Sequence, residues 1–264
     1  MPLRPNGVGV LVLAGSSGRV DADRARLLAS TGAVTESIQW FGGPAQRPAP
    51  FEVPLEVFQA RIAALAAQAD RVVVVGTSFG AEAALLVASV TPAVAAVAAF
   101  APSHVVWAGV RPDGTQTSHW TSGGAPLPFV PLAEDWQPGS DPPAFVDHYR
   151  RSLAAVSPAQ RLAATIAVER IPEVLLVAGG DDLVWPSVDA AQTITARRLA
   201  AGRHTEVVSL AGAGHRTILP GEPEVSGGMR MARGGTPDAD RALGAMAWPA
   251  VHRLLTGAAA PTTG

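Results

Sequence analysis

Short apolar runs alternate along this chain with segments whose apolar residues recur at the spacing of a helix. The apolar runs predict β-strands at residues 8–13, 35–40, 71–75, 94–100, 174–178 and 206–210. The helical spacing predicts helices at residues 22–30, 55–69, 79–90 and 238–255. Unbroken apolar strands are buried on both faces, which is typical of a parallel sheet covered by helices. The pattern therefore predicts an α/β fold with a mainly parallel, doubly wound sheet.

Two stretches interrupt this alternation. Residues 103–145 are rich in Pro, Gly, Ser and Thr, and loops this long inside a domain usually serve as lids or binding loops. We therefore expect an irregular insert or lid at about residues 103–165. Residues 220–237 separate the last strand from a terminal helix, and residues 257–264 are expected to form a disordered tail. The length of 264 residues fits one domain, 1–264, and no internal repeat divides it.

The N-terminal segment MPLRPNGVGVLVLAGSSG has an arginine, an apolar run and small residues, as a secretory signal peptide does. Its apolar run is only about seven residues long and contains Gly9. A helical pattern follows directly, which favours a buried strand that opens a β-turn-α unit. No other run is long and apolar enough to cross a bilayer. We expect a soluble, cytoplasmic protein.

Composition excludes several kinds of chemistry. The formal net charge is −2, which argues against nucleic acid or a membrane surface as a partner. All 20 basic residues are arginine, so no lysine can form a Schiff base or act as a general base. The absence of cysteine excludes disulfides, thiolate metal sites and a cysteine nucleophile. A chain rich in Arg and Ala without lysine is typical of a GC-rich bacterial genome.

A serine between two glycines follows one predicted strand, in the stretch RVVVVGTSFG. The residues GTSFG fit G-x-S-x-G, the turn that exposes a nucleophilic serine between a strand and a helix. The pentapeptide alone is a weak signal, but a strand precedes it here and a helix follows it. This context favours Ser78 as a nucleophile over an ordinary serine in a glycine-lined turn.

A nucleophilic serine needs a base, and the base needs an acid that orients it. Where this motif occurs, the order along the chain is Ser, then Asp or Glu, then His. The segment VLLVAGGDDLVWPS ends a strand with two aspartates, and the spacing favours Asp182 over Asp181 as the acid. The structural alternative is that both acids cap a helix that begins near Pro186.

His215 is the only histidine that follows a predicted strand in a loop of small residues, AGAGHRT. Gly212 and Gly214 are expected to let this loop fold back across the sheet edge towards Ser78. The other histidines are expected at the surface, with a substrate-pocket role as the alternative for the first three: His104, His119, His148, His204 and His252.

Acyl transfer also needs N–H donors for the oxyanion that develops on the carbonyl. We expect one from the backbone of Phe79 and one from Ser16, with Ser17 as the alternative, in the loop LAGSSG. That loop lacks the lysine of a phosphate-binding P-loop and does not match G-x-G-x-x-G. No His, Asp and Glu residues cluster at metal-ligand spacing, so neither a metal nor another cofactor is expected.

Together these residues resemble the acyl-CoA thioesterase and bile-acid-CoA:amino acid N-acyltransferase family, through its C-terminal α/β-hydrolase domain, which is dienelactone-hydrolase-like. The similarity covers residues 8–255. Its most specific segment is IAVERIPEVLLVAGGDDLVWPS, and the others are LAGSSGRVDADRARLLASTG, VVVVGTSFGAEAALLVAS, LAGAGHRTILP and GGTPDADRALGAMAWPAVHRLL. The resemblance implies the α/β-hydrolase fold and a triad of Ser78, Asp182 and His215.

Two departures from the family bear on function. Two-domain members carry an N-terminal β-sandwich that helps to shape the substrate site, whereas we expect this sequence to begin at the catalytic domain. The N-acyltransferase branch uses cysteine at the nucleophile position, where this chain has Ser78. Because water normally resolves a serine acyl-enzyme, this difference favours hydrolysis over transfer to an amine.

The favoured interpretation is a serine hydrolase that cleaves small-molecule acyl thioesters or esters. The alternatives are an acyltransferase that uses an amine or alcohol acceptor, a carboxylesterase or dienelactone-hydrolase-like enzyme, and a non-catalytic binding protein. Five aromatic residues are candidates for a substrate pocket, with ordinary core packing as the alternative: Trp107, Trp120, Phe129, Trp136 and Trp185. The acyl group, the pathway and the oligomeric state do not follow from the sequence.

Overall fold

A six-stranded parallel sheet forms the centre of the computed structural model, which describes residues 5–224 and 228–256. Its strands lie in the order β11-β10-β5-β4-β1-β2. Their bounds are β1 (Val8–Leu13), β2 (Val34–Ser37), β4 (Arg71–Thr77), β5 (Val94–Phe100), β10 (Glu173–Gly179) and β11 (Glu206–Leu210). Each neighbouring pair is parallel, so all six strands end at the same edge of the sheet. The predicted parallel sheet is therefore confirmed.

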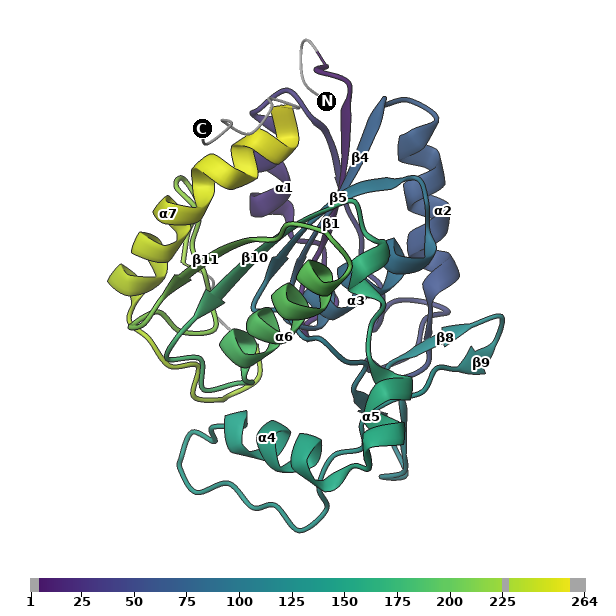
Figure 1. The fold of residues 1–264 in the computed structure, drawn as a ribbon, viewed down its shortest axis with the longest axis vertical. Helices are drawn as coiled ribbons and strands as arrows, with labels where there is room; N and C mark the ends of the chain where they lie inside the picture. Colours follow the sequence, from purple (N-terminus) through teal and green to yellow (C-terminus); the bar gives the residue numbers. More distant parts are fainter. Residues whose placement is uncertain (1–4, 225–227, 257–264) are drawn as a thin grey trace.

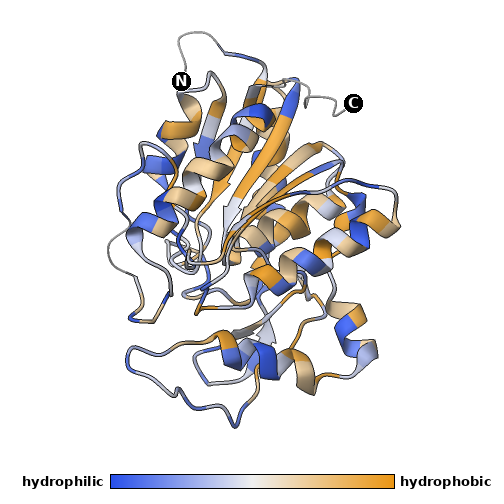
Figure 2. Cartoon of the chain, turned by 60° about the vertical axis from the view of Figure 1, so that its left-hand side comes forward, coloured by the Kyte–Doolittle hydropathy of each residue, from blue (hydrophilic) through white to orange (hydrophobic). Residues whose placement is uncertain are grey.

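Helices cover both faces of the sheet (Figure 1). The helices α1 (Ala22–Ala29) and α7 (Pro237–Thr256) pack on one face. On the other face lie α2 (Leu55–Ala66), α3 (Phe79–Val90) and α6 (Ser187–Ala200). Successive side chains of a strand point to opposite faces of the sheet, so β4 contributes side chains to the apolar core on each face. Val72 and Val74 enter the core under α2 and α3, while Val73 and Val75 enter the core under α1 and α7. Figure 2 shows the resulting apolar strands between amphipathic helices.

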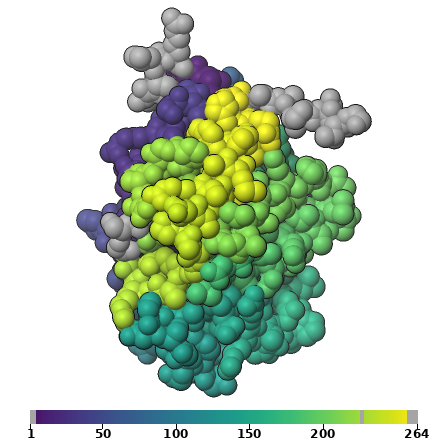
Figure 3. All heavy atoms as spheres, turned by 90° about the vertical axis from the view of Figure 1, so that its left-hand side faces the viewer, coloured from purple at the N-terminus to yellow at the C-terminus, as the bar shows by residue number. Residues whose placement is uncertain are grey.

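The segment between β5 and β10 forms an insert beyond the carboxyl ends of the strands (Figure 1). It holds β6 (Ala108–Val110), β7 (Gln116–Ser118), β8 (Trp120–Ser122), β9 (Ala125–Pro126), α4 (Val146–Ala155), α5 (Pro158–Ala164) and the 3-10 helix η1 (Val168–Arg170). The short strand β3 (Val53–Pro54) pairs with β8 and joins the insert to α2. In Figure 3 the teal residues of the insert gather at the lower end of the molecule.

The predicted elements differ from the observed ones mainly at their ends. The strand predicted at residues 35–40 ends at Ser37, and the helix predicted at residues 55–69 ends at Ala66. The insert is more regular than expected, because residues 103–145 contain four short strands and two helices, α4 and α5, follow within 146–164. The expected disordered tail, 257–264, lies outside the described residues. Within 5–224 and 228–256, no helix is both long and apolar enough to cross a membrane.

Candidate active site

Ser78 lies at the turn between β4 and α3, at the edge where the strands end. Its φ of 59° and ψ of −124° are unfavourable for a residue with a side chain. Its N–H donates to the carbonyl of Phe100 at 2.9 Å, which ties the turn to the end of β5. A serine held in a strained strand-to-helix turn is the backbone geometry of a nucleophile elbow.

Two glycines allow this turn to form. A Cβ added at Gly76 would lie 2.1 Å from the carbonyl oxygen of Gly80, and one added at Gly80 would lie 2.3 Å from that of Leu13. Side chains at either position would collide with backbone that cannot move aside. The glycines of G-x-S-x-G thus permit the close approach of strand and helix that the sequence predicts.

The loop after β1 packs against the serine turn. A Cβ built on Gly15 would lie 3.0 Å from the Cβ of Ser78 and 3.6 Å from its Oγ. Ser16 and Ser17, which follow, are exposed. Phe79 begins α3 directly after the serine. The segments that carry the predicted oxyanion donors are therefore neighbours, and the roles of Phe79, Ser16 and Ser17 stay predictions.

Asp182 and His215 form a buried pair on the loops after β10 and β11. His215 Nδ1 lies 2.8 Å and 3.0 Å from the two carboxylate oxygens of Asp182. The Asp182 carboxylate also accepts from the N–H groups of Val184 and Trp185 and from the hydroxyl of Ser187. Asp181, the alternative acid, instead accepts from the N–H of Gly235 at 2.7 Å. The carboxylate that contacts the histidine is that of Asp182.

Trp185 links this pair to the serine turn. Its ring centroid lies 6.0 Å from that of His215 and 5.5 Å from that of Phe79, the residue after Ser78. Its indole N–H donates to the carbonyl of Ala101 at 3.0 Å, at the end of β5. Trp185 therefore contacts Asp182, His215 and Phe79, the residue that follows Ser78, at one sheet edge.

The segment before α7 and the first turn of α7 hold the histidine loop, which the sequence pattern did not predict. The N–H of His215 donates to the carbonyl oxygen of Arg233 at 2.9 Å. The N–H of Gly214 donates to the carboxylate of the buried Asp240 at 2.7 Å. A Cβ on Gly214 would lie 2.2 Å from the carbonyl oxygen of Gly234. Burial raises the pKa of the Asp240 carboxyl. The glycine pair GG before the helix was the available signal, since it permits this backbone contact.

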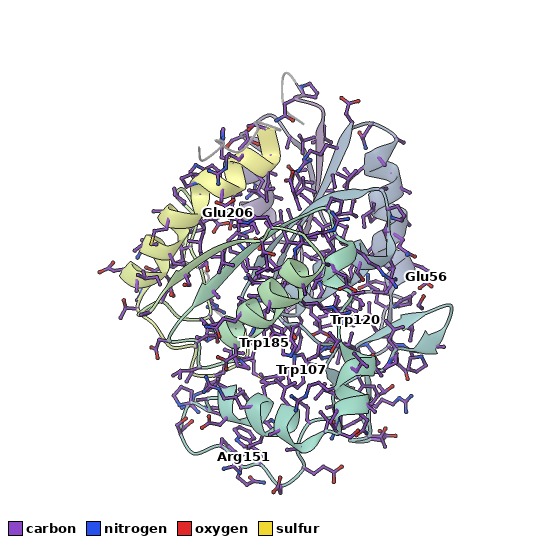
Figure 4. The ribbon with its side chains drawn as sticks, in the orientation of Figure 1. Glu56, Trp107, Trp120, Arg151, Trp185 and Glu206 are labelled. Carbon is purple, nitrogen blue, oxygen red and sulfur yellow. The ribbon has the colours of Figure 1, made fainter. Side chains whose placement is uncertain are left out.

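The predicted pocket aromatics are mostly packed in the core. Trp107, Trp120 and Trp185 are at most 2% exposed, and Figure 4 shows Trp107 and Trp185 between the sheet and α4. Phe129 packs against the core under α2 and α3, and Trp136 stacks on His148 with centroids 4.4 Å apart. Trp107 and Trp185 also line a cavity of about 10 Å³, room for one water. This cavity is too small for an acyl chain.

Two histidines expected at the surface are instead buried or nearly so. His119 is 2% exposed, and its Nδ1 lies 3.2 Å from both carboxylate oxygens of Glu82 on α3. Burial lowers the pKa of His104 to about 4. His204 and His252 are exposed, as expected, and His148 is half-buried against the carbonyl of Ala133. The surface prediction was therefore wrong for His119 and His104, because the insert folds over the sheet edge.

Comparison with known proteins identifies the family and the fold. Residues 53–256 match the family model described as BAAT / acyl-CoA thioester hydrolase C terminal. Among solved structures, the protein named m3DLH is 18% identical, with 96% of this chain and 87% of that chain covered and a TM-score of 0.51. The esterase domain of a Rhodothermus marinus protein is 18% identical, with 81% of each chain covered and a TM-score of 0.46.

A Klebsiella pneumoniae protein assigned as a dienelactone hydrolase is 16% identical, with 81% of this chain and 78% of that chain covered and a TM-score of 0.48. No curated protein sequence matches the chain significantly. At these identities a structural likeness bears on the fold alone. The family match and the parallel sheet together confirm the predicted α/β-hydrolase fold.

Proposed function

This chain belongs to the BAAT / acyl-CoA thioester hydrolase C-terminal family, and on that premise we propose that it is a serine hydrolase of acyl thioesters. The observation that carries the proposal is the buried contact of 2.8 Å between His215 Nδ1 and Asp182. It lies at the sheet edge where Ser78 occupies its strained turn. A base with an orienting acid is what a serine needs to become a nucleophile.

In the acylation step, Ser78 Oγ attacks the thioester carbonyl carbon while His215 Nε2 takes the hydroxyl proton. Asp182 holds the imidazole by its Nδ1–H and stabilises the imidazolium that forms. The N–H groups of Phe79 and Ser16, with Ser17 as the alternative, donate to the oxyanion. When the tetrahedral intermediate collapses, the carbon–sulfur bond breaks and the leaving thiolate takes the proton from His215.

Water completes the cycle. His215 removes a proton from a water molecule, whose oxygen attacks the acyl carbon of the Ser78 ester. The intermediate then releases the carboxylic acid, and the serine oxygen recovers the proton from the imidazolium. In this proposal water, and not an amine or alcohol, attacks the ester on Ser78. The reaction is therefore a hydrolysis.

The test combines a substrate panel with a serine variant. Acyl-CoA, acyl-pantetheine and p-nitrophenyl esters are compared by kcat/KM, with products identified by mass spectrometry. Ser78→Ala should lower turnover by roughly 10⁴-fold or more and abolish labelling by a fluorophosphonate. Ser89→Ala, on α3 behind the turn, is the matched control and should keep both, because among the described residues the Ser89 hydroxyl donates only to the carbonyl of Leu86.

The possible results separate the alternatives. Faster turnover of thioesters than of oxygen esters supports the proposal, and a preference for oxygen esters makes the chain a carboxylesterase. An acyl product that appears only with an added amine or alcohol makes it an acyltransferase. Retained activity or labelling in Ser78→Ala overturns the serine mechanism, and an unlabelled wild-type protein without turnover makes it a binding protein.

A further inference from the structure

Arg24, on α1, is a buried arginine whose guanidinium contacts three separate segments at the active edge of the sheet. The side chain is only 6% exposed. Its Nε and Nη2 donate to the two carboxylate oxygens of Glu222, at 2.7 Å and 2.9 Å. Its Nη1 donates to Thr77 Oγ1 at 2.7 Å, and Nη2 also donates to the carbonyl of Thr217 at 3.0 Å. The guanidinium carbon lies 4.6 Å from the centroid of the Phe100 ring.

These contacts lie beside the predicted triad. Thr77 directly precedes Ser78, and Phe100 accepts the N–H of Ser78 at 2.9 Å. Thr217 lies two residues after His215. One guanidinium therefore bonds to the segment that carries the nucleophile and to the segment that carries the base. Glu222 fixes the guanidinium in turn, and its own carboxylate is held by the N–H of Leu219 at 2.8 Å.

The charge state of Arg24 suits this arrangement. Burial alone lowers the pKa of Arg24, but the charge and hydrogen bond of Glu222, together with the charge of Asp21, leave the pKa raised. A buried ion pair contributes little net stability compared with apolar residues of similar volume, because both ions lose their hydration. What the pair does supply is a fixed geometry, since a planar guanidinium offers five donors in set directions.

We propose that Arg24 is a positioning residue that fixes Ser78 relative to His215. This inference rests on the proposed function. The backbone of Ser78 is strained, so the surrounding structure must hold it in place. A displacement of about 1 Å between reacting groups costs roughly 100-fold in rate. The hydrogen bonds of Arg24 to Thr77 and Thr217 oppose such a displacement directly.

The test uses Arg24→Lys, which keeps the positive charge and removes the planar fork, in the full chain. Steady-state rates on the best thioester of the panel are normalised to the folded fraction from circular dichroism. We expect kcat to fall about 10- to 100-fold while KM changes less than about threefold. The second-order rate of fluorophosphonate labelling should fall in parallel, because Ser78 activation is what is lost.

Two further variants keep the test decisive if Arg24→Lys does not fold. Thr77→Val removes only the acceptor of Nη1 and should lower kcat about 3- to 10-fold with KM unchanged. Arg197→Lys is the matched control, because Arg197 on α6 makes a similar two-point contact with Glu169 on η1, at 2.6 Å and 2.9 Å. It should leave kcat and the labelling rate unchanged.

The outcomes distinguish this inference from the proposed function. A wild-type protein that labels and turns over, with Arg24→Lys and Thr77→Val equally fast per folded molecule, overturns the inference alone. A parallel rise in KM, or a loss explained wholly by unfolding, also overturns it and leaves Arg24 a structural residue. A wild-type protein that neither labels nor turns over any member of the panel overturns both.

Discussion

Two buried histidine–carboxylate pairs lie near the same sheet edge, and their surroundings differ. His215 Nδ1 lies 2.8 Å from the nearer oxygen of Asp182, and His119 Nδ1 lies 3.2 Å from both oxygens of Glu82. Each histidine is packed against an aromatic ring near the serine turn. The His119 ring centroid lies 4.3 Å from that of Phe79. Residue type and burial alone therefore do not show that the two pairs have different roles.

The elements that carry each pair do separate them. Asp182 and His215 come from two loops that follow neighbouring strands, where side chains from the ends of parallel strands meet. Glu82 lies one helical turn after Ser78 and accepts from the N–H of Trp107 at 3.0 Å and from the indole N–H of Trp120 at 2.7 Å. The Glu82 carboxylate thus accepts two N–H groups of the insert and holds the insert against α3. We interpret this second pair as an anchor for the insert, distinct from the proposed triad.

The largest difference should appear when each histidine is replaced by glutamine. His215→Gln removes the proposed base and should lower kcat/KM by roughly 10⁴-fold or more. His119→Gln keeps a side-chain donor beside Glu82 and should leave kcat/KM within about tenfold of the wild-type value. Both rates are measured on the same thioester and normalised to folded protein. Equal losses in the two variants would contradict the assignment of distinct roles.

The two adjacent aspartates offer a comparison at shorter range. Asp182→Asn leaves the shape of the site but cannot stabilise the imidazolium of His215, and kcat should fall by about 10³- to 10⁴-fold. Asp181→Asn weakens only the hydrogen bond from the N–H of Gly235, so a fall of less than about tenfold is expected. Steady-state kinetics at pH 8 measure both. A larger loss in Asp181→Asn would reverse the assignment of the acid.

The sheet and the triad candidates could be predicted because their signals are local. A nearly unbroken apolar run defines β1, β4, β5 and β10, and the strand and helix that flank Ser78 adjoin it in sequence. The loops after the last two strands likewise carry Asp182 and His215 directly. Parallel strands then place these loop ends at one edge without any further information from side chains.

Contacts between residues that are far apart in the sequence leave no local pattern from which they could be predicted. His119 is 37 residues from Glu82, and the partners of Arg24 are 53, 193 and 198 residues away from it. Nothing near His119 or Arg24 in the sequence indicates that either is buried, because burial is decided by how the insert and the loop before α7 fold back. The helix α4 was not predicted either, although it is longer than α1, which was predicted.

If Glu82 anchors the insert, its loss should cost stability. Glu82→Ala leaves His119 and the two donors from the insert without an acceptor in a buried site, and we expect a loss of about 3–5 kcal/mol in the free energy of unfolding. Glu169→Ala breaks a partly exposed pair with Arg197 and should cost less than about 1 kcal/mol. Urea denaturation monitored by tryptophan fluorescence measures both. Similar small losses would mean that the insert does not depend on Glu82.

A third histidine, His104 in the insert, has no carboxylate partner: it is largely buried, and its Nδ1 has no hydrogen-bond partner in the described residues. Burial, followed by the charge of Arg161, lowers its pKa from 6.5 to about 4, against the opposing charge of Asp189. As the pH falls below 6.5, the unfolded chain therefore binds a proton that the folded chain does not bind until about pH 4. The contribution of His104 to the free energy of unfolding is therefore lost as the pH falls from the higher to the lower of these two pKa values.

The size of this loss follows from the two pKa values. From pH 7 to pH 5, His104 should remove about 2 kcal/mol from the free energy of unfolding, whereas His104→Gln has no such group to titrate. Urea denaturation of both proteins at the two pH values gives the difference, and the other titrating groups, common to both proteins, cancel. The same loss in both proteins would show that His104 takes up its proton in the folded state, as a histidine with a carboxylate partner would.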